Sequence, residues 1–154
     1  MINAKDVIKM KVPFPSVDSG LAVAAHMYIC RSKYETQYEF VKCQSVKPYM
    51  LLPTYNNPIA HYHDEEVDSA RNPFRQTTRI DCEKLFSSKN VTYDDRLKAN
   101  NPAQVCNDLF KIIQNKLALS QYKVIPMTEE ELIRLNTYIT NISDGYQRES
   151  SSNA

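Results

Sequence analysis

The scarcest residue type in the chain is glycine, which occurs only twice in 154 residues. Glycine adopts positive φ angles without steric cost, so a chain with so little of it must form most of its turns with other residues. Asparagine and proline suit turns, and they occur together at 56–58 and 100–102. We therefore expect these two segments to separate elements of regular structure.

A second absence concerns membranes and secretion. The chain contains no run of about 18 apolar residues, the length that a membrane-spanning helix needs. It also shows no leader with the charged, apolar and small-residue regions that direct secretion. The sequence thus predicts no membrane segment, and the cytoplasm is the expected compartment.

Closely spaced metal ligands are also nearly absent. The four cysteines form no C-x-x-C pair and stand at Cys30, Cys43, Cys82 and Cys106. Such scattered thiols are most often small buried hydrophobic residues, and we interpret them so. His61 and His63 are the one pair with metal-like spacing, because alternate residues of a strand share a face. The acidic run that follows favours a solvated loop, so we expect neither a metal ion nor another cofactor.

The net charge is only +1, which argues against a strongly basic polyanion-binding protein. The charge is nevertheless uneven, since the first 60 residues hold seven Lys or Arg against four Asp or Glu. This surplus attracts phosphate groups only if the strands gather it on one face. For any single lysine, a solvated surface position is the simpler expectation.

Short strands are expected through most of the first 86 residues. Residues 7–12 alternate between lysine and apolar side chains, the pattern of a strand with one buried face. Further strands are predicted where apolar, aromatic and β-branched residues gather, at 21–30, 38–46, 59–63 and 74–86, and a short apolar run occupies 49–52. Five or six short strands separated by turn signals favour a mainly β fold, specifically a small closed barrel.

The final third has helical periodicity. Asn101 before Pro102 predicts a capped helix start, and the helix should run to about Ser120 with one apolar stripe of Val105, Leu109, Ile112, Ile113 and Leu117. A capping box at Thr128 and Glu131 predicts a second helix, whose stripe is Leu132, Leu135, Ile139 and Ile142. We expect this helix to pack on the barrel, and the polar tail 143–154 to be disordered.

The order of these segments has a counterpart in a known family. The opening strand ends in Val-Pro-Phe-Pro at 12–15, a polar loop with Gly20 follows, and residues 74–85 read Phe-Arg-Gln-Thr-Thr-Arg-Ile-Asp-Cys-Glu-Lys-Leu. In these features residues 4–120 resemble the PemK/MazF-like proteins. The resemblance implies an SH3-like barrel with its C-terminal helix at 1–120. The additional helical extension expected at 121–142 lies beyond the part of the chain that the resemblance covers. The resemblance also implies a homodimer, an antitoxin or other regulatory partner, and metal-free cleavage of single-stranded RNA.

The residues that carry catalysis in this family match only in part. Cleaving members have Arg-Pro after the first loop, and that position falls at Ala24-Ala25, which supply no charge for the phosphate. Their Ser or Thr near the end of the third strand corresponds to Ser45, which would position or activate the attacking 2′-hydroxyl. His26 is either a replacement acid, base or cation or a hydrogen-bonded core residue. Its apolar neighbours favour the core interpretation.

Other cations stand where they would replace the missing arginine. Arg75 and Arg79 lie four residues apart and share a side of an extended strand, and Lys11 lies at the entrance of the loop. For each of them an ion pair or a solvated surface is the simpler expectation. Under the resemblance, the candidates for stacking on unpaired bases are Tyr49, Tyr55 and Tyr62.

Two functions of different class follow from these residues. The first is an endoribonuclease in which His26 and Ser45 serve the 2′-hydroxyl and the leaving group, and Arg75 or Arg79 holds the phosphate. The second is a catalytically inactive barrel that binds a protein or a nucleic acid as a regulatory module. A histidine accessible from a cleft that also holds Ser45 and a cation would favour the first.

Overall fold

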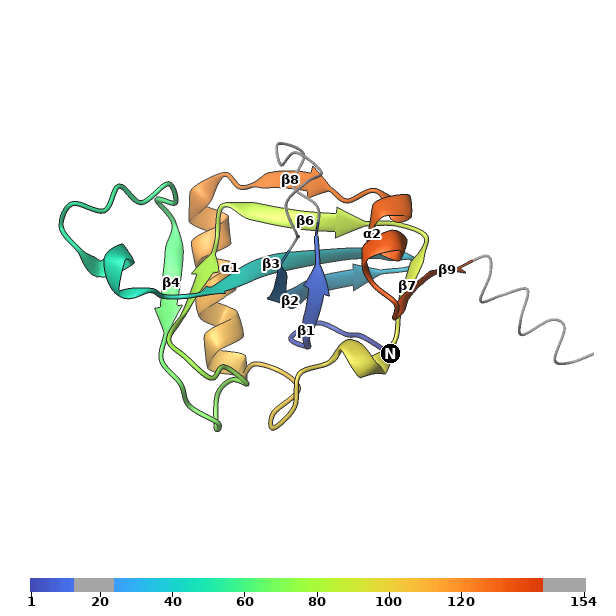
Figure 1. The fold of residues 1–154 in the computed structure, drawn as a ribbon, viewed down its shortest axis with the longest axis horizontal. Coiled ribbons are helices and arrows are strands. Elements are labelled where there is room, and N and C mark those ends of the chain that lie inside the picture. The colour runs from blue at the N-terminus through green and yellow to red at the C-terminus, as the bar shows by residue number, and fades with distance from the viewer. Residues whose placement is uncertain (13–23, 143–154) are drawn as a thin grey trace, which may run out of the picture.

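The computed structural model describes residues 1–12 and 24–142. The polar loop containing Gly20 and the predicted disordered tail therefore lie outside the described residues. Figure 1 shows strands at the centre of the molecule, with helix α1 towards the left of the view, next to β4, and helix α2 towards the right. The mainly β prediction is confirmed.

Local sequence accounts for most of the elements. The strands are β1 (Val7–Lys11), β2 (Ala25–Tyr34), β3 (Gln37–Ser45), β4 (Tyr62–Glu65), β5 (Thr78–Asp81), β6 (Lys84–Ser88), β7 (Val91–Tyr93), β8 (Lys123–Pro126) and β9 (Ile139–Asn141). The helices are α1 (Asn107–Ser120) and α2 (Glu129–Leu135), with short 3-10 helices η1 (Pro48–Leu51) and η2 (Asp95–Leu97). The apolar run at 49–52 thus falls mainly in η1. The segment 74–86 holds two strands rather than one, and the strand expected at 59–63 lies at β4.

The main sheet has the order β1-β2-β3-β5-β4. Strand β3 divides its second edge between two partners, because β6 pairs with its first residues and β5 with its last. Strand β8 then adds to β6 in parallel. Strands β1 and β4 are the two ends of the main path and do not pair with each other. The prediction of a closed barrel is therefore wrong. On the outer edge of β1, Ile8 forms a single bridge to Lys98, and Asp6, the residue before β1, forms one to Gln104.

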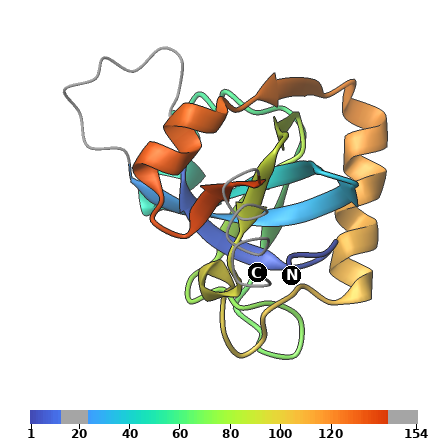
Figure 2. The same ribbon diagram turned by 90° about the vertical axis from the view of Figure 1, so that its right-hand side faces the viewer.

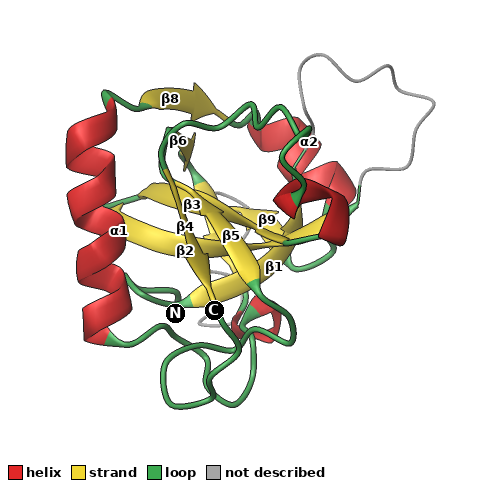
Figure 3. Ribbon diagram, turned by 90° about the vertical axis from the view of Figure 1, so that its left-hand side faces the viewer, coloured by secondary structure: helices red, strands yellow, loops and turns green. Residues whose placement is uncertain are grey.

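The sheet has a separate hydrophobic core on each face. Adjacent residues of β1 point to opposite faces, so Val7 packs in one core and Ile8 in the other. Helix α1 covers the Val7 face with Leu109, Ile113 and Leu117, each of which is almost fully buried. Helix α2 lies on the opposite side of the sheet from α1, as Figure 2 and Figure 3 show. At about 2 kcal/mol for each buried Leu or Ile, the apolar stripe is what holds α1 in place.

Helix α1 begins later than its sequence pattern predicts. Asn101 has a φ of 54°, in the left-handed region, whereas a helix N-cap residue normally has extended backbone angles. Cys106 takes that role, and its Sγ accepts a hydrogen bond from the backbone N–H of Leu109 at 3.4 Å. The predicted start at Pro102 is wrong, although Val105 is buried in the same core as the helix. The other three cysteines are free and buried, which confirms their interpretation as small hydrophobic residues.

Helix α2 is shorter than predicted. It ends at Leu135 because the side chain of Asn136 donates a hydrogen bond to the carbonyl of Leu132 at 2.9 Å. The same amide pairs with the backbone N–H and C=O of Lys11, both at 2.8 Å. Ile139 therefore belongs to β9, which pairs with β7, and not to a helix. The segment 121–142 is a strand, a helix and a second strand rather than a purely helical extension.

Candidate functional site

Antiparallel pairing brings the predicted catalytic residues to one edge of the sheet. Strand β2 begins with Ala25 and His26, and strand β3 ends with Ser45. Because β2 and β3 run in opposite directions, with Met27 opposite Cys43, the start of one lies beside the end of the other. Ser45 in turn pairs with Thr78 at the start of β5. Residues distant in sequence are thus gathered around one point.

A cavity of about 200 Å³ lies at this point, and we call it the histidine cavity. Its lining includes His26, Ser45 and Arg75, together with Lys9 from β1. His26 and Ser45 are half-buried, whereas Arg75 is exposed. The structure therefore brings together a titratable ring, a hydroxyl group and two cations, which are the groups that phosphoryl transfer uses.

A second cavity, the tyrosine cavity, adjoins the first and measures about 540 Å³. It shares His26 and Ser45 with the histidine cavity, and Tyr49 and Tyr55 form its aromatic side. The two tyrosine rings are 5.7 Å apart in an edge-to-face arrangement. Tyr49 is 59% exposed, so its ring is accessible for stacking by a planar ligand.

Three lysines that sequence reasoning missed also line the tyrosine cavity, namely Lys42, Lys47 and Lys84. Lys42 lies in the middle of β3 between two residues whose side chains are buried, and nothing local indicates that it faces a cavity. Strand alternation places Lys42 on the same face as Gln44, which was the one available signal. The sequence does not show the register of the pairing between β3 and β6, which brings Lys84 of β6 to this face.

His26 is in a state suited to accepting a proton. Burial, and then the positive charge of Lys42, lower the pKa of His26 below its ordinary value of 6.5. The imidazole is therefore neutral at neutral pH. Within the described part of the chain, no hydrogen bond or ion pair holds its ring nitrogens. The predicted core histidine with a fixed hydrogen-bond partner is thus not what the structure shows.

The two candidate arginines differ sharply. Arg79 is only 3% exposed and forms a bidentate pair with Asp64, with N–O distances of 2.8 and 2.9 Å. It also lies over the ring of Tyr62, with the guanidinium carbon 4.2 Å from the ring centroid. Its charge is therefore already balanced, although it lines the tyrosine cavity. Arg75 has no ion pair with a described residue and lines the histidine cavity.

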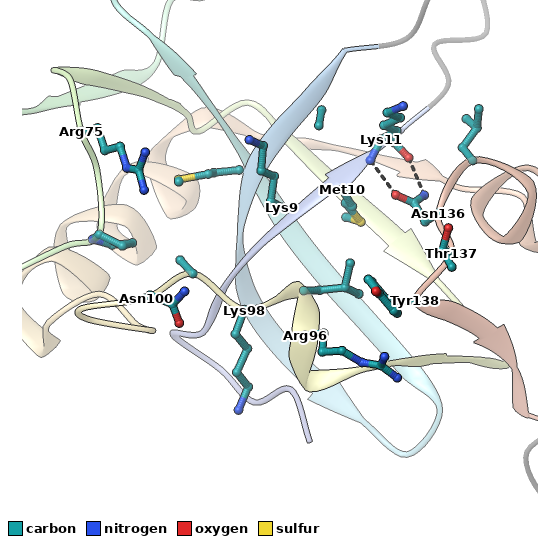
Figure 4. A pocket seen from close by; sticks show the side chains of 16 residues that line it. Lys9, Met10, Lys11, Arg75, Arg96, Lys98, Asn100, Asn136, Thr137 and Tyr138 are labelled. Atoms are coloured by element: carbon teal, nitrogen blue, oxygen red, sulfur yellow. Dashed lines mark hydrogen bonds between the residues drawn. The ribbon is translucent and has the colours of Figure 1, made fainter.

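Two of the predicted RNA-binding residues lie outside both cavities. Tyr62 is covered by Arg79, so it is not among the residues lining the tyrosine cavity. Lys11 lines a third depression of about 610 Å³, which we call the lysine cleft. Figure 4 shows this cleft with Lys9, Lys11 and Arg75 on one side and Arg96 and Tyr138 on the other. Sequence reasoning missed Arg96, because the acidic residues beside it make the segment read as neutral.

The remaining histidines are bound within the fold. His63 pairs with Glu65 at 3.0 Å, and His61 pairs with Glu83 at 3.2 Å. Within residues 1–12 and 24–142, no three His, Cys, Asp or Glu side chains are grouped so that they could hold a metal ion. Over the same residues, no helix is both long enough and apolar enough to cross a membrane.

Comparison of the chain with models of known protein families and with curated proteins found no match in either. The resemblance to PemK/MazF-like proteins therefore stays a prediction from the motifs at 12–15 and 74–85. The functional argument must come from the chemistry of the cavities.

Proposed function

We propose that this protein cleaves single-stranded RNA without a metal ion, at the histidine cavity. The observation that carries the proposal is the meeting of His26, Ser45 and Arg75 around one cavity, with a neutral and unpaired imidazole among them. The three residues come from three separate segments of the sequence, so they lie close together only in the folded chain.

The proposed reaction is an internal transesterification. His26 takes the proton of a ribose 2′-hydroxyl, whose oxygen then forms a bond to the adjacent phosphorus. The bond from phosphorus to the 5′-oxygen breaks, and that oxygen receives a proton relayed from water through the Ser45 hydroxyl. Arg75 stabilises the negative charge on the non-bridging phosphate oxygens. The products are a 2′,3′-cyclic phosphate and a 5′-hydroxyl end.

The charge arrangement supports this chemistry despite the alanine at the family's arginine position. The family's Arg-Pro corresponds to Ala24-Ala25, and Ala25, the residue after the missing arginine, lines all three cavities, so this uncharged pair lies beside the site. Lys9 and Arg75 line the same histidine cavity from two other segments. In a PemK/MazF-like, SH3-like protein, the phosphate-binding charge would thus come from β1 and from the loop before β5, while the hydroxyl residue is kept.

The tyrosine cavity supports an RNA strand as the substrate. A base that stacks on Tyr49 or Tyr55 gains about 1–3 kcal/mol without requiring a set sequence. Lys42, Lys47 and Lys84 line the same cavity and attract the phosphate groups on either side of such a base. A cavity of about 540 Å³ is also in the size range of sites that hold small organic ligands.

The experiment that tests the proposal is incubation of the purified full chain with mixed-sequence single-stranded RNA in EDTA. We expect cleavage that leaves 2′,3′-cyclic phosphate ends, and its loss in both Ser45→Ala and His26→Ala. His61→Ala is the matched control, since it removes a histidine that lines neither cavity, and it should cleave normally. RNA that stays intact over a wide range of protein concentrations would contradict the proposal.

The regulatory binding module is the second candidate, and one observation favours it. Arg79, a candidate phosphate-holding cation, is paired with Asp64 through its Nε and Nη2, as in a structural ion pair. Intact RNA that nevertheless binds, with weaker binding in Tyr49→Ala, would support this candidate. The homodimer and antitoxin that the family resemblance implies are further proposals, tested by sedimentation of the purified chain and by co-purification of a partner.

A further inference from the structure

The lysine cleft is a second charged surface that the cleavage chemistry does not use. Five basic residues line it and no acidic residue does, the five being Lys9, Lys11, Arg75, Arg96 and Lys98. It adjoins the histidine cavity, because Lys9, Ala25, Met27 and Arg75 line both. A polyanion bound at the histidine cavity would therefore extend into the lysine cleft.

The cations of this cleft are not all neutralised by neighbours. Arg96 pairs with Asp94 at 3.1 Å, and Lys98 lies 3.6 Å from both Asp6 and Asp95. The side chains of Lys9, Lys11 and Arg75 have no ion pair with a described residue. Lys9 and Lys11 are alternate residues of β1, so they share a face and lie about 6.8 Å apart along the strand. Repeated cations of this kind suit a chain of phosphates better than one small anion.

A second wall of the cleft comes from the C-terminal segment. Leu135, Asn136, Thr137 and Tyr138 line it between α2 and β9. Asn136 fixes this wall to β1 through its two hydrogen bonds to the backbone of Lys11, drawn as dashed lines in Figure 4. Tyr138 is 39% exposed and carries Arg96 over its ring at 4.4 Å. The wall thus offers an aromatic surface beside the cations.

We infer that the lysine cleft binds the phosphate backbone of the RNA strand that continues beyond the cleavage point. This inference rests on the proposed function, because it assigns the cleft to the same substrate. The cleft increases the length of RNA that the protein contacts. It contacts phosphate groups rather than base edges, so it does not select a base sequence. It also gives the C-terminal segment a role, which is to form the second wall of the RNA path.

The test uses the full chain and two lengths of single-stranded RNA, of about 4 and about 16 nucleotides, which span the site sizes of single-strand binding folds. Binding of the longer strand is measured as its uncleavable 2′-O-methyl form over a range of salt concentrations. The double variant Lys11→Gln with Arg96→Gln removes two cations that line neither cavity of the proposed cleavage site. We expect the salt slope of its binding constant to fall by about 1.4, at about 0.7 per phosphate contact in single strands.

The matched control is Lys89→Gln with Arg134→Gln. It also removes one exposed lysine and one salt-bridged arginine, since Arg134 pairs with Glu131 at 4.0 Å, and its side chain is 66% exposed against 68% for Arg96. The control should keep the salt slope of the unmodified chain, and both double variants should cleave the shorter strand at the unmodified rate, which also shows that they fold. Equal salt slopes in the two double variants would overturn the inference alone. An unmodified chain that neither binds nor cleaves either strand would overturn the proposed function with it.

Discussion

The histidines of this chain divide into two regions that treat the same side chain in opposite ways. Around β4, His63 pairs with Glu65, which also accepts hydrogen bonds from Arg71 and Asn72. At the start of β2, His26 lies half-buried between two cavities with no such partner among the described residues. A histidine whose ring nitrogens are hydrogen-bonded within the fold has no free donor or acceptor for a ligand. A histidine beside a cavity whose ring nitrogens have no partner can bind a ligand or transfer a proton.

The sharpest way to test this comparison is to remove one histidine from each region. We expect His26→Ala to lower the rate of RNA cleavage by about 10²–10⁴-fold, the usual contribution of a general base, while thermal stability changes little. His63→Ala should show the reverse pattern, with lower stability and an unchanged rate per folded molecule. Cleavage rates and thermal melting curves of the two purified variants measure these two effects. Equal loss of cleavage in both variants would contradict the division.

The next effect concerns stability around β4. Burial alone would raise the pKa of Glu65, but the hydrogen bonds from Arg71, His63 and Asn72 hold it below its ordinary value of 4.5. Removing the carboxylate leaves these partners without an acceptor, so we expect Glu65→Ala to lower the free energy of unfolding by about 3 kcal/mol. Urea unfolding at neutral pH measures this. A variant as stable as the unmodified chain would show that the network is dispensable.

The same carboxylate predicts a pH dependence of stability. A carboxyl group whose pKa is lower in the folded state stabilises the fold at pH values above its unfolded pKa. We therefore expect the contribution of Glu65 to be complete above pH 4.5 and to be lost as the pH falls through its folded-state pKa. The unmodified chain should lose its stability advantage over Glu65→Ala in that range, as unfolding curves at several pH values would report.

A smaller effect is expected at the tyrosine cavity. Burial is the main reason for the low pKa of His26, and the charge of Lys42 is the second. Lys42→Gln removes that charge, so the pKa of His26 should rise towards 6.5. Because protonated His26 cannot act as a base, the cleavage rate decreases as the pH drops through this pKa, and the decrease should begin at a higher pH in the variant. Cleavage rates measured over a range of pH values test this. Lys47 lines the same cavity, and Lys47→Gln should leave the pH at which the rate decreases unchanged.

The smallest effect is expected for His61. Its side chain is 44% exposed, and its pair with Glu83 is of the kind that adds little to stability in water. We expect His61→Gln to change the free energy of unfolding by no more than about 0.5 kcal/mol. A loss in urea unfolding comparable to that of Glu65→Ala would mean that the two pairs around β4 act as one unit.

The features that sequence predicted are those set by local pattern. The alternation at 7–12 predicted strand β1, the apolar run at 21–30 predicted strand β2, and the apolar stripe predicted α1. The start of α1 was not predictable from Asn101 and Pro102, because a local capping pattern says nothing about the backbone angles that the tertiary structure imposes. The end of α2 depends on a contact between Asn136 and Lys11, which are 125 residues apart.

The site followed the same rule. The family resemblance selected Ser45, and His26, Arg75 and Arg79 were the candidates to replace the missing arginine. The structure brings Ser45, His26 and Arg75 together at one cavity. The engagement of Arg79 by Asp64 depends on the pairing register of β4 with β5, which places the two residues directly opposite each other. Register between strands that are distant in sequence is not visible in composition or periodicity, so the difference between the two arginines could not be predicted.

The amide of Asn136 has a consequence for the synthesis of the protein. Its contact with Lys11 joins the earliest strand to one of the last elements, and the core on that face also needs Leu132 and Ile139. A nascent chain therefore completes neither this core nor the second wall of the lysine cleft until the segment from Leu132 to Ile139 has been synthesised. A chain cut short before Asn136 would therefore lack both the contact with Lys11 and one wall of the lysine cleft.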